Sequence, residues 1–330
     1  MPSYDILTIG SATQDVFVRS KDWEEESDPY APAGIDACLP MGAKLNVSEL
    51  FIGTGGGATN AAATFGSLGL KVAAVSRIGN GPVADFVRAD IKRFHVDTSC
   101  FQIDKKNLTG YSIILLSKEG HRSILSYRGA SSFMKASEFC WKKKSIKTKW
   151  LYLSSFGGKT ELLKPVFDFA KKQKAKVAWN PGSKELEANI RTLKPFIKQT
   201  DILQVNREEA ALLTHLPPRD TAGLSKSVGA MVKDIFILTD GSKGAYIKQG
   251  DEDYFVDTLP GERVNTTGAG DAFCSGFVSG LILKGDTDSA IRFASLNSDG
   301  VVKAMGAKAG ILQRPPSKAV MSKVKITKHS

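Results

Sequence analysis

The order of apolar segments in the second half of the chain is the feature that most restricts the fold. From Trp150 onward, short apolar runs typical of buried strands alternate with segments typical of helices. The predicted strands are Trp150–Ser154, Lys176–Trp179, Ile202–Val205 and Ile235–Thr239, and the predicted helices between them are Glu161–Lys172, Lys184–Ile190 and Glu208–Leu213. Because such alternation joins parallel strands through helical crossovers, we expect an α/β fold: a doubly wound, mainly parallel sheet with helices on both faces.

Three segments do not fit this alternation and predict a second, smaller sheet. Strand-like pieces at 15–19 and 44–52 lie in an irregular stretch of the chain. Further on, Thr109–Leu116 and His121–Tyr127 form a predicted hairpin that turns on Lys118-Glu119-Gly120. We expect a single domain over residues 1–330, with a small β-sheet lid formed by segments 15–55 and 109–128.

Composition and cysteine spacing argue against several classes of protein. The chain is 42% apolar and 24% charged, which is typical of globular proteins, and it has no apolar run of 18 residues. Met1–Asp5 lacks the basic and apolar regions of a signal peptide, so neither secretion nor a membrane span is expected. The four cysteines, Cys38, Cys100, Cys140 and Cys274, share no short spacing. They predict neither a zinc site nor a disulfide framework, and a cytoplasmic location is the simplest expectation.

The net charge of +11 raises the possibility of a nucleic-acid partner. The lysines gather in Trp141–Lys149, Phe169–Lys176 and Ser317–Lys328, with no recognition motif and no interleaved stacking aromatics. A solvated surface that attracts anionic substrates is the preferred interpretation, and no nucleic-acid partner is expected.

A short glycine-containing loop near the C-terminus predicts phosphoryl chemistry. Asn265-Thr266-Thr267-Gly268-Ala269-Gly270-Asp271 directly precedes a long apolar helix, Ala272–Leu283. The bare backbone of Gly268, Ala269 and Gly270 can direct several N–H groups at an anion, where the helix also presents its positive end. A carboxylate at Asp271 would repel that anion, so its presence there is best explained if it acts as a base on a hydroxyl. The alternative is an ordinary glycine turn with Asp271 as a helix-start residue.

Further polar and glycine residues follow the predicted strands. They are Asp15, Gly55-Gly56-Gly57 with Asn60, the pair Asn206 and Glu209, and the turn Thr239–Gly244. Taken singly, each has an ordinary structural explanation, such as a turn residue or a helix cap. Because ligands of a doubly wound sheet bind beyond the carboxyl ends of its strands, their joint placement predicts one site.

Together, these motifs resemble the ribokinase-like carbohydrate kinases, the PfkB family, in the same order along nearly the whole chain. The resemblance implies ATP and Mg²⁺ as cofactors and transfer of the γ-phosphoryl group to a hydroxyl. It also implies roles for individual residues: Asp271 as general base; Gly268, Ala269 and Gly270 as anion hole; Asp15, Gly56 and Asn60 as substrate-binding residues; Asn206, Thr239, Gly241, Gly244 and Ser295 as nucleotide contacts; and Glu209 as the acid that organises magnesium through water.

Some positions depart from the family pattern. The loop begins with Asn265, where the family usually has an aspartate that helps to bind an activating monovalent cation, so K⁺ dependence is left open. Thr13 and Gly57 replace the asparagine and lysine common in ribokinases proper, so the substrate need not be ribose.

We therefore expect an ATP-dependent kinase that acts on a sugar or sugar-like compound. A nucleoside is the nearest alternative acceptor, because lid aromatics (Phe17, Phe51, Tyr111 and Tyr127) would allow a base to stack. Arg128 is a candidate for binding a carboxylate or phosphate of the substrate, although a solvated arginine is the more ordinary interpretation. A non-catalytic sugar or nucleotide sensor on the same fold is a further alternative. A homodimer through the lid is expected from the resemblance alone.

Overall fold

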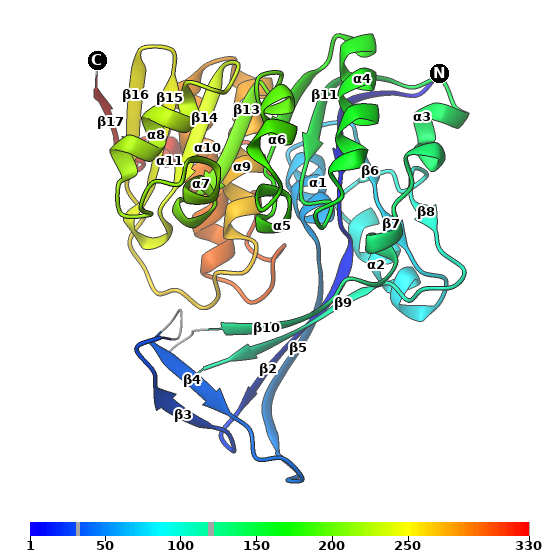
Figure 1. Cartoon of the computed structure of the whole chain (residues 1–330), viewed down its shortest axis with the longest axis vertical. Coiled ribbons are helices and arrows are strands. Elements are labelled where there is room, and N and C mark those ends of the chain that lie inside the picture. The colour runs from blue at the N-terminus through cyan, green and yellow to red at the C-terminus, as the bar shows by residue number, and fades with distance from the viewer. Residues whose placement is uncertain (31–33, 118–121, 330) are drawn as a thin grey trace.

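A large central sheet organises the molecule (Figure 1). The structure is a computed structural model that describes residues 1–30, 34–117 and 122–329. Within these residues the strands of the large sheet lie in the order β17-β16-β15-β14-β13-β12-β11-β1-β6. Six neighbouring strands of this order, β14, β13, β12, β11, β1 and β6, run parallel to one another. The other three, β15, β16 and β17, pair with their neighbours in antiparallel fashion. The bounds are β1 (Ser3–Ile9), β6 (Val72–Val75), β11 (Lys147–Leu153), β12 (Lys176–Trp179), β13 (Ile202–Asn206), β14 (Ile235–Thr239), β15 (Ala245–Gln249), β16 (Glu252–Val256) and β17 (Ile326–His329).

Helices cover both faces of this sheet, because successive residues of its strands are buried on opposite sides. In β14, Phe236 and Leu238 belong to one apolar core, whereas Ile235 and Ile237 belong to the other. The first core is closed by α4 (Leu163–Gln173), α6 (Ile190–Ile197), α7 (Arg207–Thr214) and α8 (Thr221–Gly229). The second is closed by α1 (Gly57–Ser67), α9 (Ala269–Lys284) and α10 (Thr287–Val302). The remaining helices are α2 (Pro82–Lys92), α3 (Cys140–Lys143), α5 (Ser183–Leu186) and α11 (Lys318–Met321). In the described ranges, no helix combines the length and apolar character that a membrane crossing requires.

A four-stranded sheet projects from one end of this core (Figure 1). Its order is β10-β9-β2-β5, with bounds β2 (Thr13–Ser20), β5 (Val47–Gly55), β9 (Gly110–Leu116) and β10 (Arg122–Tyr127). Strands β9 and β10 are antiparallel, as the predicted hairpin requires, but its turn at 118–120 lies outside the described residues. Two short pairs, β3 (Glu24–Ser27) with β4 (Ile35–Cys38) and β7 (Arg77–Ile78) with β8 (Gln102–Ile103), complete the strands.

The predicted α/β class, with a mainly parallel sheet covered on both faces and a smaller sheet beside it, is confirmed. The predicted helix Lys184–Ile190 is wrong, because the chain forms α5 and α6 on either side of Asn189. The Asn189 side chain accepts the N–H of Arg191 and thereby starts a new helix where the sequence suggested a continuous one. Helix α8 and strand β17 were not expected, and β17 arises because the lysine-rich tail pairs with β16.

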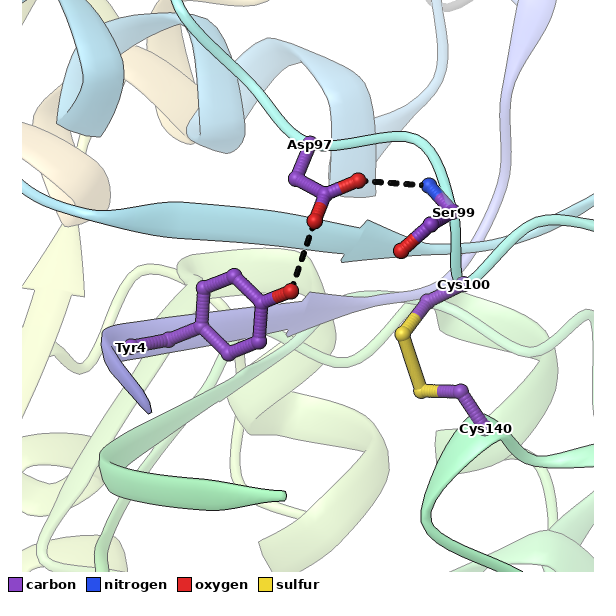
Figure 2. Close-up of a disulfide and its surroundings, with 5 residues drawn as sticks. All are labelled: Tyr4, Asp97, Ser99, Cys100 and Cys140. Carbon is purple, nitrogen blue, oxygen red and sulfur yellow. Dashed lines mark hydrogen bonds between the residues drawn. A yellow bond between two sulfur atoms is a disulfide. The ribbon is translucent and has the colours of Figure 1, made fainter. Parts of the chain in front are cut away.

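The expectation about disulfides is also wrong. Cys100 and Cys140 form a disulfide with their Cα atoms 5.1 Å apart, although 40 positions separate them in sequence (Figure 2). Strand β1 lies between β6 and β11, so it brings the loop that carries Cys100 close to the segment preceding β11. The Tyr4 hydroxyl of β1 donates to the Asp97 carboxylate at 2.6 Å beside this disulfide. Cysteine spacing therefore gives no support for a reducing compartment.

Candidate functional site

The carboxylate of Asp271 lies between the first turn of α9 and the beginning of α1. Its Oδ2 accepts a hydrogen bond from Asn60 Nδ2 at 2.8 Å, and its Oδ1 accepts one from Asn180 Nδ2 at 3.4 Å. Gly268 precedes the helix with φ of 83°, a left-handed conformation that suits glycine, and directs the backbone of Ala269 and Gly270 into the helix start. The loop thus places a partly exposed carboxylate at the positive end of a 16-residue helix.

The charges around Asp271 act on its protonation in opposite directions. Burial raises the pKa of Asp271 most strongly, and the nearby carboxylate of Asp15 raises it further. The hydrogen bond from Asn60 and the ammonium group of Lys308 lower this pKa. A carboxylate with a raised pKa, held by two amide groups, is suited to accept a proton from a hydroxyl.

Asp15 and the glycines of residues 55–57 form the neighbouring wall of the site. The Asp15 side chain is 5% exposed and lies directly over Gly55, where a Cβ atom would be 1.9 Å from its Oδ2. Gly56 has φ of 94°, and a Cβ atom there would lie 2.5 Å from the carbonyl oxygen of Ser11. A Cβ atom at Gly57 would lie 3.3 Å from Asp271 Oδ1. A side chain at Gly55 or Gly57 would therefore crowd one of the two carboxylates, and one at Gly56 would collide with the backbone of Ser11 and Ala12.

Asn60 has an oxygen that is available to a ligand. Its side chain is 6% exposed, and its Nδ2 is used by Asp271. Its Oδ1 is buried and finds no hydrogen-bond donor in the part of the chain that the structure describes. Because a buried acceptor without a donor is costly, this oxygen favours a bound hydroxyl group.

Arg128 follows β10 and lies near the loop after β11. A Cβ atom at Gly157 would be 2.6 Å from its Nη1, so the guanidinium group packs on the backbone of that loop. Arg128 is half-buried. The structure thus places it at the junction of the small sheet and the core, but gives it no direct contact with Asp15, Asn60 or Asp271.

A single cleft of about 540 Å³ contains all five residues assigned to nucleotide binding. It is also lined by Ala269 and Gly270, so the cleft reaches the loop that carries Asp271. The five residues come from the ends of two neighbouring strands, from the turn after β14 and from α10; they are Asn206, Thr239, Gly241, Gly244 and Ser295. The Oγ atom of Ser295 is buried and has no partner within the described ranges, which again favours a polar ligand.

Asn206 and Glu209 hold each other at the start of α7. Asn206 Oδ1 accepts the Glu209 N–H at 2.8 Å, and Glu209 Oε2 accepts the Asn206 N–H at 3.0 Å, which is a capping box. Burial raises the pKa of Glu209, and the carboxylate of Asp271 contributes in the same direction. The carboxylate of Glu209 is therefore close enough to the candidate base to interact with it electrostatically.

The donor groups of the site fit ATP and Mg²⁺. The cleft offers backbone N–H groups at the positive end of α9 and the Ser295 hydroxyl, which has no partner among the residues that the structure describes. Within residues 1–30, 34–117 and 122–329, no cluster of three or more His, Cys, Asp or Glu side chains gathers to hold a metal ion. Magnesium typically keeps several waters and binds through one or two carboxylates plus substrate phosphates, a mode for which Glu209 is sufficient.

Asn265 is buried, and its side chain stabilises the loop 265–271 by a hydrogen bond to the backbone of that loop. Its Oδ1 accepts the Thr267 N–H at 3.0 Å, and its Nδ2 has no acceptor among the described residues. An unpaired amide donor at this position is a poor neighbour for a cation.

The structure adds residues to the site that the sequence analysis missed. Asn180 follows β12 directly and donates a hydrogen bond to Asp271. Its position at the carboxyl end of a parallel strand, the same signal that pointed to Asn206 at the end of β13, would have predicted it. Gln204 donates to the Gly270 carbonyl at 2.8 Å from the middle of β13, where no sequence signal marks it. Lys308 is 7% exposed and lies among the site's carboxylates, but it is one of 45 lysines and arginines.

Comparisons with known proteins agree with this geometry. The chain matches the family model described as pfkB family carbohydrate kinase over residues 37–314. It is similar to the ribokinase of Haemophilus influenzae, with 25% identity over 276 residues, covering 83% of this chain and 89% of that protein.

Solved structures show the same fold. A nucleoside kinase of Methanocaldococcus jannaschii, described as an archaeal member of the ribokinase family, superimposes with a TM-score of 0.74 at 20% identity, covering 98% of this chain and 99% of that one. Arabidopsis thaliana ribokinase, solved with ribose and ATP, gives 0.73 at 19% identity, covering 98% and 99%. Because the family model matches most of the chain, the chain belongs to the PfkB family of carbohydrate kinases.

Proposed function

We propose that this protein transfers the γ-phosphoryl group of ATP to a hydroxyl group of a sugar or sugar-like substrate, with Asp271 as general base. One observation carries the proposal. The Asp271 carboxylate is bound by Asn60 on the substrate side, while Ala269 and Gly270, from the same helix start, line the nucleotide cleft. A base in this position faces both reactants.

The proposed roles follow from the contacts. Asn60 and Asn180 orient the Asp271 carboxylate, which accepts the proton of the attacking hydroxyl. The backbone N–H groups of Gly268 and Gly270 and the positive end of α9 stabilise the negative charge of the transferred group, whereas the Ala269 N–H already donates to the Thr266 carbonyl at 3.3 Å. Bound ATP would supply the phosphoryl group, and magnesium, held through water by Glu209, would neutralise part of its charge.

The substrate wall favours a polyhydroxyl acceptor. Asp15 can accept from hydroxyl groups, and the free Asn60 Oδ1 can accept from another. Two of the aromatics that would stack on a nucleoside base contact each other instead: the Phe17 and Phe51 rings meet edge to face with centroids 5.8 Å apart. Arg128, at the edge of this wall, would select acceptors that carry a carboxylate or phosphate.

An acceptor panel tests the function directly. Purified protein is incubated with ATP, Mg²⁺ and pentoses, hexoses, sugar acids or nucleosides, and ADP formation is measured. We expect turnover with at least one sugar-like acceptor and a fall of about 10² to 10⁴ in rate for Asp271→Asn. Asp168→Asn, an exposed change on α4, is the matched control and should leave the rate unchanged.

Three outcomes would contradict the proposal. Full turnover by Asp271→Asn would remove the base from the mechanism. Binding of sugar and ATP without ADP formation, in the wild type as in the variant, would identify a non-catalytic sensor. Turnover with nucleosides alone would replace the sugar by a nucleoside acceptor.

We also propose that the four-stranded sheet is a lid that pairs with a second copy of the chain. One face carries a row of apolar residues in register across all four strands, Leu125, Ile113, Val16 and Ile52, of which Val16 is buried and the other three are exposed. Leu125 is 58% exposed and Ile52 is 49% exposed, which is unusual for large apolar side chains on a monomer surface. Sedimentation velocity should show a dimer that Leu125→Glu dissociates, and a monomeric wild type would reject this pairing.

A further inference from the structure

A three-residue segment after α10 contacts both the small sheet and the loop of the candidate base. Gly306 lies against the ring of Phe51 on β5, because a Cβ atom there would be 2.8 Å from the ring. Ala307 lies against Gly268, where a Cβ atom would be 2.7 Å from the Ala307 Cβ. Lys308 returns to β5, and its Nζ donates to Thr54 Oγ1 at 2.7 Å. The segment thus joins the lid strand to the start of α9.

Lys308 is the charged member of this segment and is buried. Its Thr54 partner donates in turn to the carboxylate of Asp90 on α2, so the ammonium, the hydroxyl and the carboxylate form a chain. Burial lowers the pKa of Lys308 to about 8, and Arg93 acts in the same direction, whereas the carboxylates of Asp90, Asp15 and Asp271 raise it.

The charge of Lys308 also acts on the site. It lowers the pKa of Asp15 and of Asp271, against the effect of burial on both. A buried lysine is retained only where specific partners compensate its desolvation, and here the partners belong to the lid, to α2 and to the site.

We propose that Lys308 is a positioning residue that fixes the end of lid strand β5 relative to the loop of Asp271. The carboxylate of Asp15, which would bind the substrate, and the base Asp271 then keep a constant distance and orientation. This inference rests on the proposed function, because it assigns Lys308 a part in the same phosphoryl transfer. Lys308 acts through Thr54 and the backbone of its segment, without contact with the reacting atoms.

The first test separates positioning from folding by kinetics. Lys308→Met keeps much of the side-chain volume but removes the charge and the hydrogen bond. We expect kcat to fall about 10- to 100-fold, as a displacement of about 1 Å at the reacting groups would cause. KM for ATP should stay unchanged, since the nucleotide cleft does not include Lys308. Lys323→Met, at an exposed position on the C-terminal tail, is the matched control.

The second test uses Thr54→Val, which breaks the same link from the side of β5. If both changes act through one link, the double variant should be no slower than Lys308→Met within a factor of two, because coupled residues are not additive. A double variant whose kcat falls by the product of the two single decreases would overturn the proposal. A kcat of Lys308→Met within twofold of the wild type would also overturn it. Where Lys308→Met does not fold, Thr54→Val and the exchange measurement below decide.

The third test does not depend on activity. Hydrogen–deuterium exchange of Lys308→Met and Thr54→Val should be faster than in the wild type in two peptides, 47–57 and 263–272, and unchanged in β13 and β14. Faster exchange in only one of the two peptides would overturn the coupling. If the wild type phosphorylates no acceptor, the proposed function fails, while the exchange result still tests the link.

Discussion

The Cys100–Cys140 disulfide should be a large contributor to stability, and its removal is a sharp test of the fold. The two cysteines close a loop of about 40 residues. The chain-entropy relation for a loop of this length gives about 4 kcal/mol at 25 °C for the constraint on the unfolded chain. The hydrogen bond from Tyr4 to Asp97 holds the same loop, but it is partly exposed and contributes about 1 kcal/mol.

Urea unfolding with and without a reductant measures this contribution without a change of side-chain volume. We expect the free energy of unfolding to fall by about 4 kcal/mol on reduction, and by a similar amount in Cys100→Ala/Cys140→Ala. Tyr4→Phe should lose about 1 kcal/mol. Cys38→Ser, at an exposed and unpaired cysteine, is the control and should unfold like the wild type.

A thiol titration in urea completes the test. Two thiols should react in the unreduced protein, those of Cys38 and Cys274, and four after reduction. Four reactive thiols before reduction, or unfolding curves that superimpose with and without reductant, would refute the reasoning.

Three further predictions concern the site. Glu209→Gln keeps an oxygen for the Asn206 N–H and should unfold like the wild type, yet need more Mg²⁺ for half-maximal rate, whereas Glu209→Ala should also lose about 1 kcal/mol of stability. The pH profile of kcat/KM should fall on the acid side at a pKa above 3.8, because burial raises the pKa of Asp271 and only its ionised form accepts a proton; Asp271→Asn should lack this limb. Asn265→Asp replaces an unpaired donor by a carboxylate, so K⁺ should stimulate this variant more than the wild type in a rate assay with and without KCl.

The alternation of strands and helices predicted the central sheet because burial on both faces leaves a clear record in sequence. That the residues assigned to nucleotide binding would line one cleft was predictable for a related reason. Asn206 and Thr239 end neighbouring parallel strands, and the carboxyl ends of such strands meet at one edge of the sheet.

What could not be predicted depends on contacts between distant segments. The pairing of Cys100 with Cys140 requires the placement of β1 between β6 and β11. Lys308 is distinguished from other lysines only by its burial beside Thr54. The break between α5 and α6 depends on one cap by Asn189, a local competition that the apolar pattern does not record.

Three strands of the small sheet leave the core at a single row of residues. Thr13 on β2 is paired with Gly55 on one side and with Gly110 on the other. As a lid, the sheet would therefore rotate about one axis through this row, where two of the three residues carry no side chain. Asp15, two positions from the axis and so about 7 Å along the strand, would move little, whereas the distant β3–β4 hairpin would sweep the widest arc. The entrance to the cleft would open widely while the Asp15 carboxylate, which we propose to bind the substrate, stays almost in place.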